Sequence, residues 1–362
     1  MSVHPIAAAD ALARLHEFSA VIDARSESEY ALDRLPGAIN WPSLNDEERA
    51  RVGTLYKQVN PFEARKLGAA LVARNIASHI EREAMDKPKS WQPLVYCWRG
   101  GQRSGALSLV LGQIGFRVTI IEGGYKAFRN AMLADLPAQA QRLHYRVVCG
   151  PTGSGKTRLL HALQGAGAQV LDLEGLAQHR ASVLGLIPGQ PQPSQKQFEM
   201  RVWDALRHFD ASRPVYVEAE SKKVGNCTVP DALMQAMRAS PCLRVDLPDH
   251  ERVALLLEDY PFFVTDPDFF CRRLDTLVAL RGRAVVDEWK QLVHSGQTPA
   301  VVRELLEKHY DPGYASSTRR NFAQFDGALP VALPDRSHAS LEAACTAILQ
   351  QQGLGSMAAL ST

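Results

Sequence analysis

A cysteine, two glycines and an arginine stand close together at a point where they could form a reactive loop. Cys97 follows a short apolar run, and Arg103 comes after five intervening residues. Gly100 and Gly101 let the backbone turn so that several N–H groups can converge on one anion. A helix expected to begin near Ser104 adds the positive end of its dipole, and all these groups would favour the thiolate form of Cys97. The pattern predicts a nucleophilic sulfur in a site for sulfur, selenium or phosphorus oxyanions.

Within this loop, Cys97 is the candidate nucleophile. Arg99 and Arg103 would bind the oxygens of the anion, because guanidinium groups hold such oxygens in bidentate pairs. The alternative is a buried apolar cysteine, which would need neither the glycines nor the arginines. The other residues expected in the anion-binding loop are Trp98, Gly100, Gly101, Gln102 and Ser104, of which Trp98 is expected mainly to pack.

A glycine-rich segment further along the chain matches the phosphate-binding pattern of Gly, four residues, Gly-Lys-Thr. It lies between a strand-like run over 145–149 and a helix-like run over 158–163, which is the context that this mechanism requires. Backbone N–H groups would surround a di- or triphosphate, Lys156 would reach its terminal phosphate, and Thr157 would bind Mg²⁺. The predicted phosphate-binding residues are Gly150, Gly153, Ser154, Gly155, Lys156 and Thr157.

Further polar residues follow predicted strands in the same part of the chain. Asp172, Glu218 and Glu220 are candidates for holding a metal ion or its water, with helix caps or salt bridges as equally weighted alternatives. His179 and Arg180 are candidates for contacts with a diphosphate or an RNA backbone, and structural roles are nearly as well supported. The sequence assigns no metal ligand with certainty.

Composition limits the class of protein. A chain of 362 residues with 46% hydrophobic and 22% charged residues predicts two globular domains. The sequence has no run of 18 apolar residues and no evident secretory signal. Its six cysteines show neither CxxC nor zinc-finger spacing, which argues against a disulfide framework or a structural metal. We therefore expect a cytoplasmic protein with no membrane association.

The charge is nearly balanced, with a formal net charge of +2. Residues 1–140 contain 17 Lys and Arg against 15 Asp and Glu, and residues 141–362 contain 24 of each. Nucleic-acid binding usually shows a basic excess, so an RNA partner would require the fold to gather the basic residues. The candidate pairs are Arg201 with Arg207, Arg272 with Arg273, Arg281 with Arg283, and Arg319 with Arg320.

Strand-like and helix-like runs alternate along both halves, which predicts two α/β domains with parallel sheets. Strands are expected over 19–23, 93–97, 117–121, 145–149, 169–173, 214–219 and 242–247. Helices are expected over 62–74, 104–115, 156–164, 197–210, 230–239 and 249–258, and throughout 270–310. Cys97 and the glycine-rich segment would then lie at the carboxyl ends of strands, where such sheets bind ligands.

Three segments of the first half resemble the rhodanese family. Residues 19–43 resemble its opening segment, the Cys97 loop resembles its active-site loop, and residues 122–124 resemble its closing segment. The usual sulfurtransferase loop has four residues between Cys and Arg, whereas this one has five. The wider loop, as in rhodanese-related phosphatases, suits a tetrahedral anion bulkier than thiosulfate.

A rhodanese domain followed by a P-loop resembles the tRNA 2-selenouridine synthase family. Residues 97–104, 172–180, 217–225 and 257–260 all resemble segments of that family. The resemblance implies a transferase that replaces the sulfur of wobble 2-thiouridine with selenium from selenophosphate, after S-geranylation by geranyl diphosphate. It also implies Mg²⁺ at the P-loop, tRNA as partner, and contact with a selenophosphate-producing enzyme. Cys97 would take selenium as a covalent adduct or hold the anion during delivery.

The resemblance divides the chain into a rhodanese-like domain and a P-loop domain joined by a linker. The predicted ranges are 1–135 for the rhodanese-like domain, 136–144 for the linker, 145–265 for the P-loop NTPase-like domain, and 266–362 for a helical C-terminal region packed on it. The leading alternative is a sulfurtransferase fused to an ATP-hydrolysing or kinase domain, with ATP in the P-loop. A cysteine phosphatase would need a general acid that the sequence does not place. The intact Cys97, Lys156 and Thr157 argue against a non-enzymatic RNA-binding adaptor.

Overall fold

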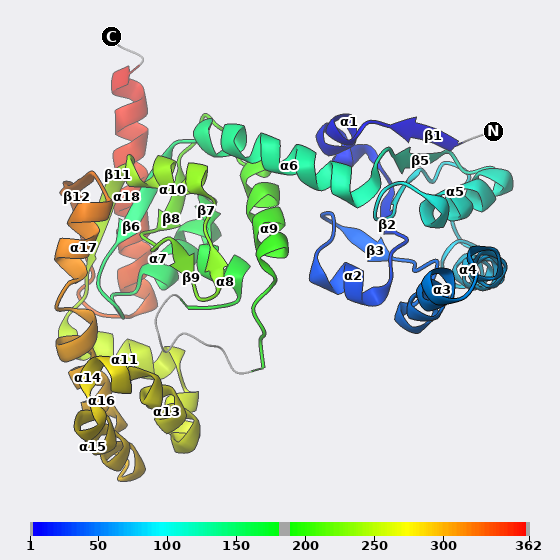
Figure 1. Cartoon of the computed structure of the whole chain (residues 1–362). Helices are drawn as coiled ribbons and strands as arrows, with labels where there is room; N and C mark the ends of the chain where they lie inside the picture. Colours follow the sequence, from blue (N-terminus) through cyan, green and yellow to red (C-terminus); the bar gives the residue numbers. More distant parts are fainter. Residues whose placement is uncertain (1–2, 181–188, 360–362) are drawn as a thin grey trace. The chain divides into compact units, whose positions relative to one another are not determined.

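The computed structural model describes residues 3–180 and 189–359, which form two compact units (Figure 1). The first unit comprises Met1–Ala138 and Pro193–Asp204, and the second comprises Gln139–Gln192 and Ala205–Thr362. Each unit contains one five-stranded parallel sheet with helices around it. The predicted α/β fold class is therefore confirmed.

The sheet of the first unit has its reactive loop on the central strand. The strand order is β1-β5-β4-β2-β3, and all four pairings are parallel. All four residues of β4 are buried, as expected for a strand covered on both faces. The strands are β1 Val3–Ile6, β2 Ala20–Asp23, β3 Ala38–Asn40, β4 Pro93–Tyr96 and β5 Val118–Ile121. The two edge strands, β1 and β3, were not predicted.

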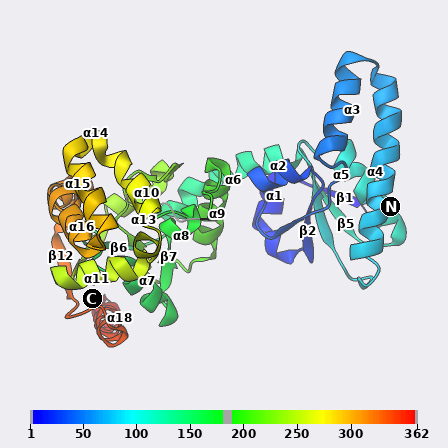
Figure 2. The ribbon, with the colours of Figure 1, turned by 90° about the horizontal axis from the view of Figure 1, so that it is seen from below.

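Helices surround this sheet, and two of them form a long hairpin seen clearly in Figure 2. The hairpin helices α3 and α4 flank a short turn, and α3 begins with a capping box in which Asn45 and Glu48 satisfy each other's backbone N–H groups. The sequence predicted only part of α4 and none of α3. The helices are α1 Ala8–Ala13, α2 Glu27–Leu32, α3 Asp46–Gln58, α4 Pro61–Glu83, α5 Gln102–Ile114 and α6 Gly124–Gln141.

Side chains of β4 alternate between two cores, one on each face of the sheet. Leu94 and Tyr96 belong to the core that includes Phe128 of α6, whereas Val95 and Cys97 belong to the opposite core. Trp203, from helix α9 (Gln195–His208), also packs in the first of these cores, and its indole N–H donates to Asp135 over 2.8 Å. The segment 193–204 therefore packs with the first unit, which differs from the contiguous range 145–265 expected for the P-loop domain.

The second unit places its glycine-rich loop after a central strand as well. The strand order is β12-β11-β6-β8-β7, and every pairing is parallel. The strands are β6 Tyr145–Cys149, β7 Gln169–Leu171, β8 Val215–Glu218, β11 Pro241–Asp246 and β12 Gln324–Ala332, with a small antiparallel pair of β9 Lys223–Val224 and β10 Cys227–Thr228. The region 266–362 was expected to be helical, but it supplies the edge strand β12.

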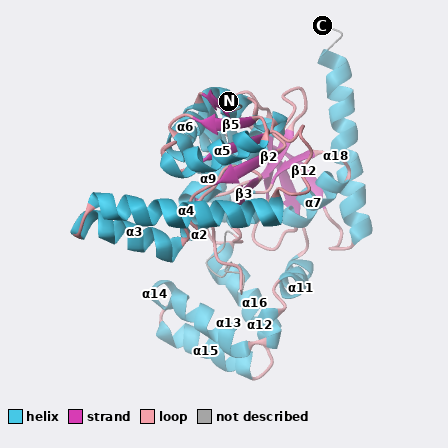
Figure 3. Ribbon diagram, turned by 90° about the vertical axis from the view of Figure 1, so that its right-hand side faces the viewer, coloured by secondary structure: helices cyan, strands magenta, loops and turns pink. Residues whose placement is uncertain are grey.

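The helices of the second unit fall into two groups. The first group accompanies the sheet and consists of α7 Lys156–Gly165, α8 Leu173–Ala177, α10 Asp231–Arg238, α17 Tyr314–Asn321 and α18 His338–Ala359. The second group consists of α11 Asp249–Asp259, α12 Phe262–Thr265, α13 Pro267–Leu274, α14 Val278–Arg281, α15 Arg283–His294 and α16 Thr298–Leu305. It has its own core around Phe270 and Trp289, and its helices α13–α16 lie away from β12 and α7 in Figure 3, whereas α11 also packs on the sheet core through Leu255.

The expected linker over 136–144 differs in the structure. Helix α6 continues to Gln141 with Pro137 inside it, so only the last three residues of that range lie outside regular structure. Among the described residues, no helix is both long and apolar enough to cross a membrane.

Candidate functional site

The Cys97 loop connects β4 to α5 and places the thiol among hydrogen-bond donors. Cys97 is only 2% exposed. Its Sγ accepts from the Gly101 N–H over 3.2 Å and from the Ser104 hydroxyl over 3.1 Å. Both donors lie within hydrogen-bond distance of the sulfur. The structure therefore brings together three of the residues predicted for this loop.

The segment after β5 holds the loop in shape. The Tyr125 N–H donates to the Cys97 carbonyl over 2.8 Å, and the Lys126 N–H donates to the Trp98 carbonyl over 3.1 Å. A Cβ on Gly124, which has φ +59°, would lie 2.2 Å from the Cys97 carbonyl oxygen, so only glycine fits there. The Trp98 ring stacks on Tyr125 with centroids 5.3 Å apart, which agrees with the expected packing role.

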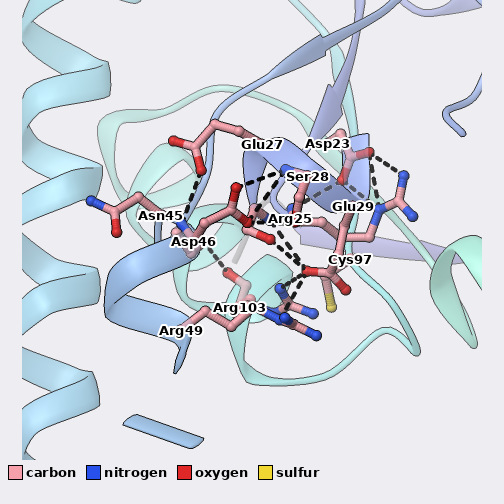
Figure 4. Close-up of polar contacts among 12 residues, drawn as sticks. Asp23, Arg25, Glu27, Ser28, Glu29, Asn45, Asp46, Arg49, Cys97 and Arg103 are labelled. Carbon is pink, nitrogen blue, oxygen red and sulfur yellow. Dashed lines mark hydrogen bonds and ion pairs between the residues drawn. The ribbon is translucent and has the colours of Figure 1, made fainter. Parts of the chain in front are cut away.

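Arg103 is held by a carboxylate that sequence reasoning did not include among the site residues. Its Nη1 donates to Glu29 Oε2 over 2.7 Å, and Arg49 contacts the same oxygen at 3.2 Å (Figure 4). Burial raises the pKa of Glu29, but the hydrogen bond and charge of Arg103 and the charge of Arg49 outweigh it and lower that pKa below its ordinary value. Arg99, by contrast, is exposed. In the sequence, Glu29 is recognisable only as the third position of a capping box with Ser26 at the start of α2, which does not reveal its contact with Arg103.

A buried ion pair fixes the chain beside this loop. Arg25 is 1% exposed and donates to Asp23 Oδ2 over 2.6 Å, with its guanidinium 4.2 Å from the ring centre of Tyr125. The Tyr96 hydroxyl donates to the same Asp23 oxygen over 2.7 Å. Because removing one partner of such a buried pair is strongly destabilising, this network ties the segment before α2 to the central strand.

The second loop, residues 150–155, joins β6 to α7 and carries the phosphate-binding pattern. Gly153 and Gly155 have φ values of +76° and +87°, so the loop uses conformations that favour glycine. The Lys156 ammonium donates to the Gly150 carbonyl over 2.8 Å and therefore folds back over the loop. The Thr157 hydroxyl donates to Glu218 Oε1 over 2.6 Å.

Three carboxylates gather beside Thr157. Glu174, Glu218 and Glu220 each place one oxygen within 4.8 Å of the others, and Glu218 and Glu220 are 4% and 6% exposed. Burial, followed by the charges of Glu218 and Glu174, raises the pKa of Glu220 well above its ordinary value. Hard cations such as Mg²⁺ prefer this set of oxygen donors, and the structure thus groups two of the predicted acidic candidates with one that was not predicted.

Asp172 and His179 do not line the cavity at the P-loop, whereas Arg180 does. Asp172 caps α8 by accepting from the Gly175 N–H over 2.8 Å, and its other oxygen lies 3.5 Å from His161. His179 is 8% exposed, and burial followed by the charge of Arg273 lowers its pKa. The structure thus favours the capping alternative for Asp172 and a buried position for His179.

A cavity of about 360 Å³ opens over the P-loop and lies in the size range of small-molecule sites. Its polar wall contains the P-loop, the three glutamates and Arg180, whose guanidinium lies 4.5 Å from the ring centre of Tyr260. Part of the lining, here called the apolar wall, is aliphatic and aromatic. That wall consists of Leu255, Leu256, Tyr260, Tyr310 and Tyr314. Sequence reasoning missed these residues, which come from α11, from the π-helical segment Leu306–Tyr310 and from α17.

Comparisons with known proteins match both units. The rhodanese-like domain family matches residues 7–131, and the tRNA 2-selenouridine synthase AAA domain family matches residues 143–268. A tRNA 2-selenouridine synthase of Nitrosomonas europaea is 38% identical over 66% of this chain and 63% of its own length. One of Marinobacter nauticus is 38% identical over 66% of this chain and 65% of its own length.

A longer match comes from the tRNA 2-selenouridine synthase of Aeromonas salmonicida, which is 33% identical over 81% of this chain and 86% of its own length. The matches to the first two relatives span slightly less than two thirds of those proteins. The two family matches cover the Cys97 loop and the P-loop in the same order along the chain, and the identity to this relative extends across both. This chain belongs to the tRNA 2-selenouridine synthase family.

Proposed function

We propose that this protein converts wobble 2-thiouridine in tRNA to 2-selenouridine in two steps, one at each loop. The observation that carries the proposal is the presence, in one chain of this family, of a buried thiol in an anion-binding loop and a P-loop cavity with one apolar wall. The first step uses geranyl diphosphate and the second uses selenophosphate.

The first step is alkylation of the thiocarbonyl sulfur. The sulfur attacks C1 of the geranyl group, the C–O bond to diphosphate breaks with its electron pair on oxygen, and N3 of the base loses its proton. Lys156 and the loop N–H groups offset the charge that develops on the leaving diphosphate. The apolar wall around Leu256 and Tyr260 supports an isoprenoid donor, because a geranyl chain offers no polar atoms to satisfy.

Thr157, Glu218 and Glu220 have the donor types that Mg²⁺ needs, so they would hold the ion at this site. When bound, it would supply positive charge next to the leaving diphosphate. Glu174 lies close enough to contribute a further oxygen. ATP is the competing ligand of the P-loop, and the apolar wall favours the prenyl donor over its ribose and third phosphate.

The second step replaces the geranylated sulfur with selenium. Selenium in selenophosphate is at the oxidation level of selenide, so an S–Se adduct on Cys97 would need an oxidant. The balanced route has the Cys97 thiolate attack phosphorus, so that an S–P bond forms while the P–Se bond breaks with its electron pair on selenium. Selenide then attacks C2 of the base and geranyl thiolate leaves, while water hydrolyses the S–P bond to release phosphate.

The residues around Cys97 support this role. The Gly101 N–H and the Ser104 hydroxyl donate to the Cys97 sulfur. Arg103, which Glu29 positions, keeps further N–H donors for the phosphate oxygens. Arg99 is exposed and available to the same anion. A selenophosphate-producing enzyme stays a predicted partner that would supply this labile co-substrate.

Nucleoside mass spectrometry tests the proposed function. Transfer RNA containing 2-thiouridine would be incubated with the protein and Mg²⁺, with geranyl diphosphate and selenophosphate added singly and together. We expect S-geranyl-2-thiouridine with the prenyl donor alone and 2-selenouridine with both. Unchanged 2-thiouridine in every reaction, together with ATP turnover in the absence of tRNA, would replace the proposal with the sulfurtransferase–ATPase alternative.

A further inference from the structure

The end of the α3–α4 hairpin nearest its turn, residues 49–74, concentrates positive charge, whereas the remaining residues of the two helices contain one Arg against five Asp and Glu. Residues 49–74 contain six Lys and Arg against one Asp or Glu, whereas the rest of residues 1–140 contains 11 against 14. All six basic side chains are exposed, namely Arg49, Arg51, Lys57, Arg65, Lys66 and Arg74. The acidic residues of α3 lie at its start, where Asp46 accepts from Ser28 and Glu48 accepts from Asn75. The fold thus gathers a basic surface that none of the predicted arginine pairs includes.

The end of the hairpin also exposes aromatic and apolar side chains. Phe62 is 63% exposed and Tyr56 is 50% exposed, although both are large hydrophobic residues. The Lys66 ammonium lies 5.0 Å from the ring centre of Phe62. Aromatic rings next to cations are the combination that binds single-stranded nucleic acid, because bases stack on the rings while the cations contact phosphates.

A groove of about 410 Å³ lies between the hairpin and the Cys97 loop. Gly68, Ala69 and Ala106 give it small side chains, and Tyr56 and Arg65 belong to its hairpin side. Gln102 and Arg103, which close the Cys97 loop, also line it. The groove therefore joins the basic hairpin to the reactive loop within the first unit.

We propose that the α3–α4 hairpin and this groove bind the single-stranded anticodon loop of the tRNA substrate. The basic residues of the hairpin contact the phosphates, Tyr56 and Phe62 stack on bases, and the groove takes an unstacked nucleotide next to the Cys97 loop. This inference rests on the proposed function, which makes tRNA the substrate. Within residues 49–74, the excess of six cations over one acidic residue favours a polyanion over a protein surface of mixed charge.

Salt-dependent RNA binding tests the hairpin. The triple variant Lys57→Gln/Arg65→Gln/Lys66→Gln would be compared with the wild type and with Lys89→Gln/Arg117→Gln. These control residues are exposed and precede β4 and β5, at the opposite edge of the sheet from the Cys97 loop. The Kd of an anticodon stem–loop RNA would be measured by fluorescence anisotropy between about 50 and about 200 mM salt. We expect the triple variant to raise the Kd about tenfold or more and to reduce the slope of log Kd against log salt concentration by about 2. The Kd of the control variant should stay within about twofold of the wild-type value.

The groove is tested separately with Ala69→Trp, which fills it from an exposed helix position. We expect RNA affinity within about threefold of wild type but selenation of geranylated RNA at least about tenfold slower. If the triple variant binds RNA like the wild type, the hairpin proposal is wrong and the surface points to a protein partner. If that variant also selenates RNA at the wild-type rate, the proposed function is unaffected. A wild-type protein that neither binds nor modifies the RNA would overturn both.

Discussion

The two loops of this chain share one architecture but differ in the charges around them. Each follows the central strand of a five-stranded parallel sheet and leads into a helix, after β4 in one unit and after β6 in the other. At the Cys97 loop, two arginines meet one glutamate, Glu29. At the P-loop cavity, three basic side chains (Lys156, Arg158 and Arg180) meet four carboxylates, those of Glu174, Glu218, Glu220 and Asp259. The first site therefore has an excess of basic side chains and the second a slight excess of acidic ones, which supports the proposed role of a divalent cation at the P-loop.

This difference supports the division of chemistry that we propose for the two loops. In that proposal the Cys97 loop contributes the nucleophile, and its N–H and O–H donors point at the buried sulfur. Cys149 ends the strand before the P-loop, but the hydrogen bond of Cys242 and burial raise the pKa of its thiol. The donors of the P-loop and the nearby carboxylates suit a leaving diphosphate. The predictions that follow change one side of the comparison at a time.

The largest effect is expected from Cys97→Ser. We expect selenation of geranylated tRNA to fall at least about a thousandfold, because a serine hydroxyl is a far weaker nucleophile at neutral pH. Cys345→Ala in α18 is the control, since that cysteine lies outside both loops. In the wild type, rapid quenching with selenophosphate and intact-protein mass spectrometry should show one added phosphoryl group. Added selenium in its place would disprove the proposed attack on phosphorus.

The next largest effect is expected at the P-loop carboxylates. Glu218→Gln should slow geranyl transfer about a hundredfold and weaken Mg²⁺ binding, because it removes a charged oxygen from the Thr157 hydroxyl and the ion. Calorimetric titration of Mg²⁺ in the presence of inorganic diphosphate measures the binding without activity. Asp172→Asn, which alters a helix cap outside the cavity, should leave that titration unchanged. If Glu218→Gln and Asp172→Asn change the Mg²⁺ titration equally, the proposed metal site is wrong.

A smaller effect is expected from Glu29→Gln at the other loop. The substitution removes the Glu29 carboxylate that positions Arg103. We therefore expect the KM for selenophosphate to rise about tenfold with little change in kcat. Glu27→Gln is a matched control on the same helix, because Glu27 accepts from the Asp46 N–H and binds neither arginine. A fall in kcat alone would contradict a positioning role for Glu29.

The smallest effect concerns the pH dependence of stability. Burial and the charges of Glu218 and Glu174 raise the pKa of Glu220, so the native state binds that proton more tightly than the unfolded chain does. The resulting stability is present in full below the ordinary glutamate pKa and is lost as pH rises through the raised value. In EDTA, Glu220→Gln should therefore melt at least about 3 °C above the wild type at pH 8 and approach it at pH 5. A difference that does not change with pH would refute this assignment.

The sequence predicted both reactive loops because each is a local pattern. Cys97 follows a short apolar strand that is fully buried, and Lys156 begins a helix directly after the glycine-rich loop, so both patterns can be recognised within a few consecutive residues. Glu29 and the aromatic wall at Tyr260 escaped prediction because they reach their loops only through tertiary packing, from α2 and α11. Strand β12 escaped because six of its nine residues are exposed, so it lacks the pattern of a buried strand. The hairpin helix α3 escaped because none of its residues is buried.

Feeding purified S-geranylated tRNA and selenophosphate to two variants tests the division of chemistry most directly. Lys156→Ala should convert this tRNA to 2-selenouridine at nearly the wild-type rate, because the P-loop step is already complete. Cys97→Ala should leave it unconverted, although it should still geranylate 2-thiouridine when given geranyl diphosphate. The reverse pattern, or equal loss in both variants, would contradict the assignment of one step to each loop.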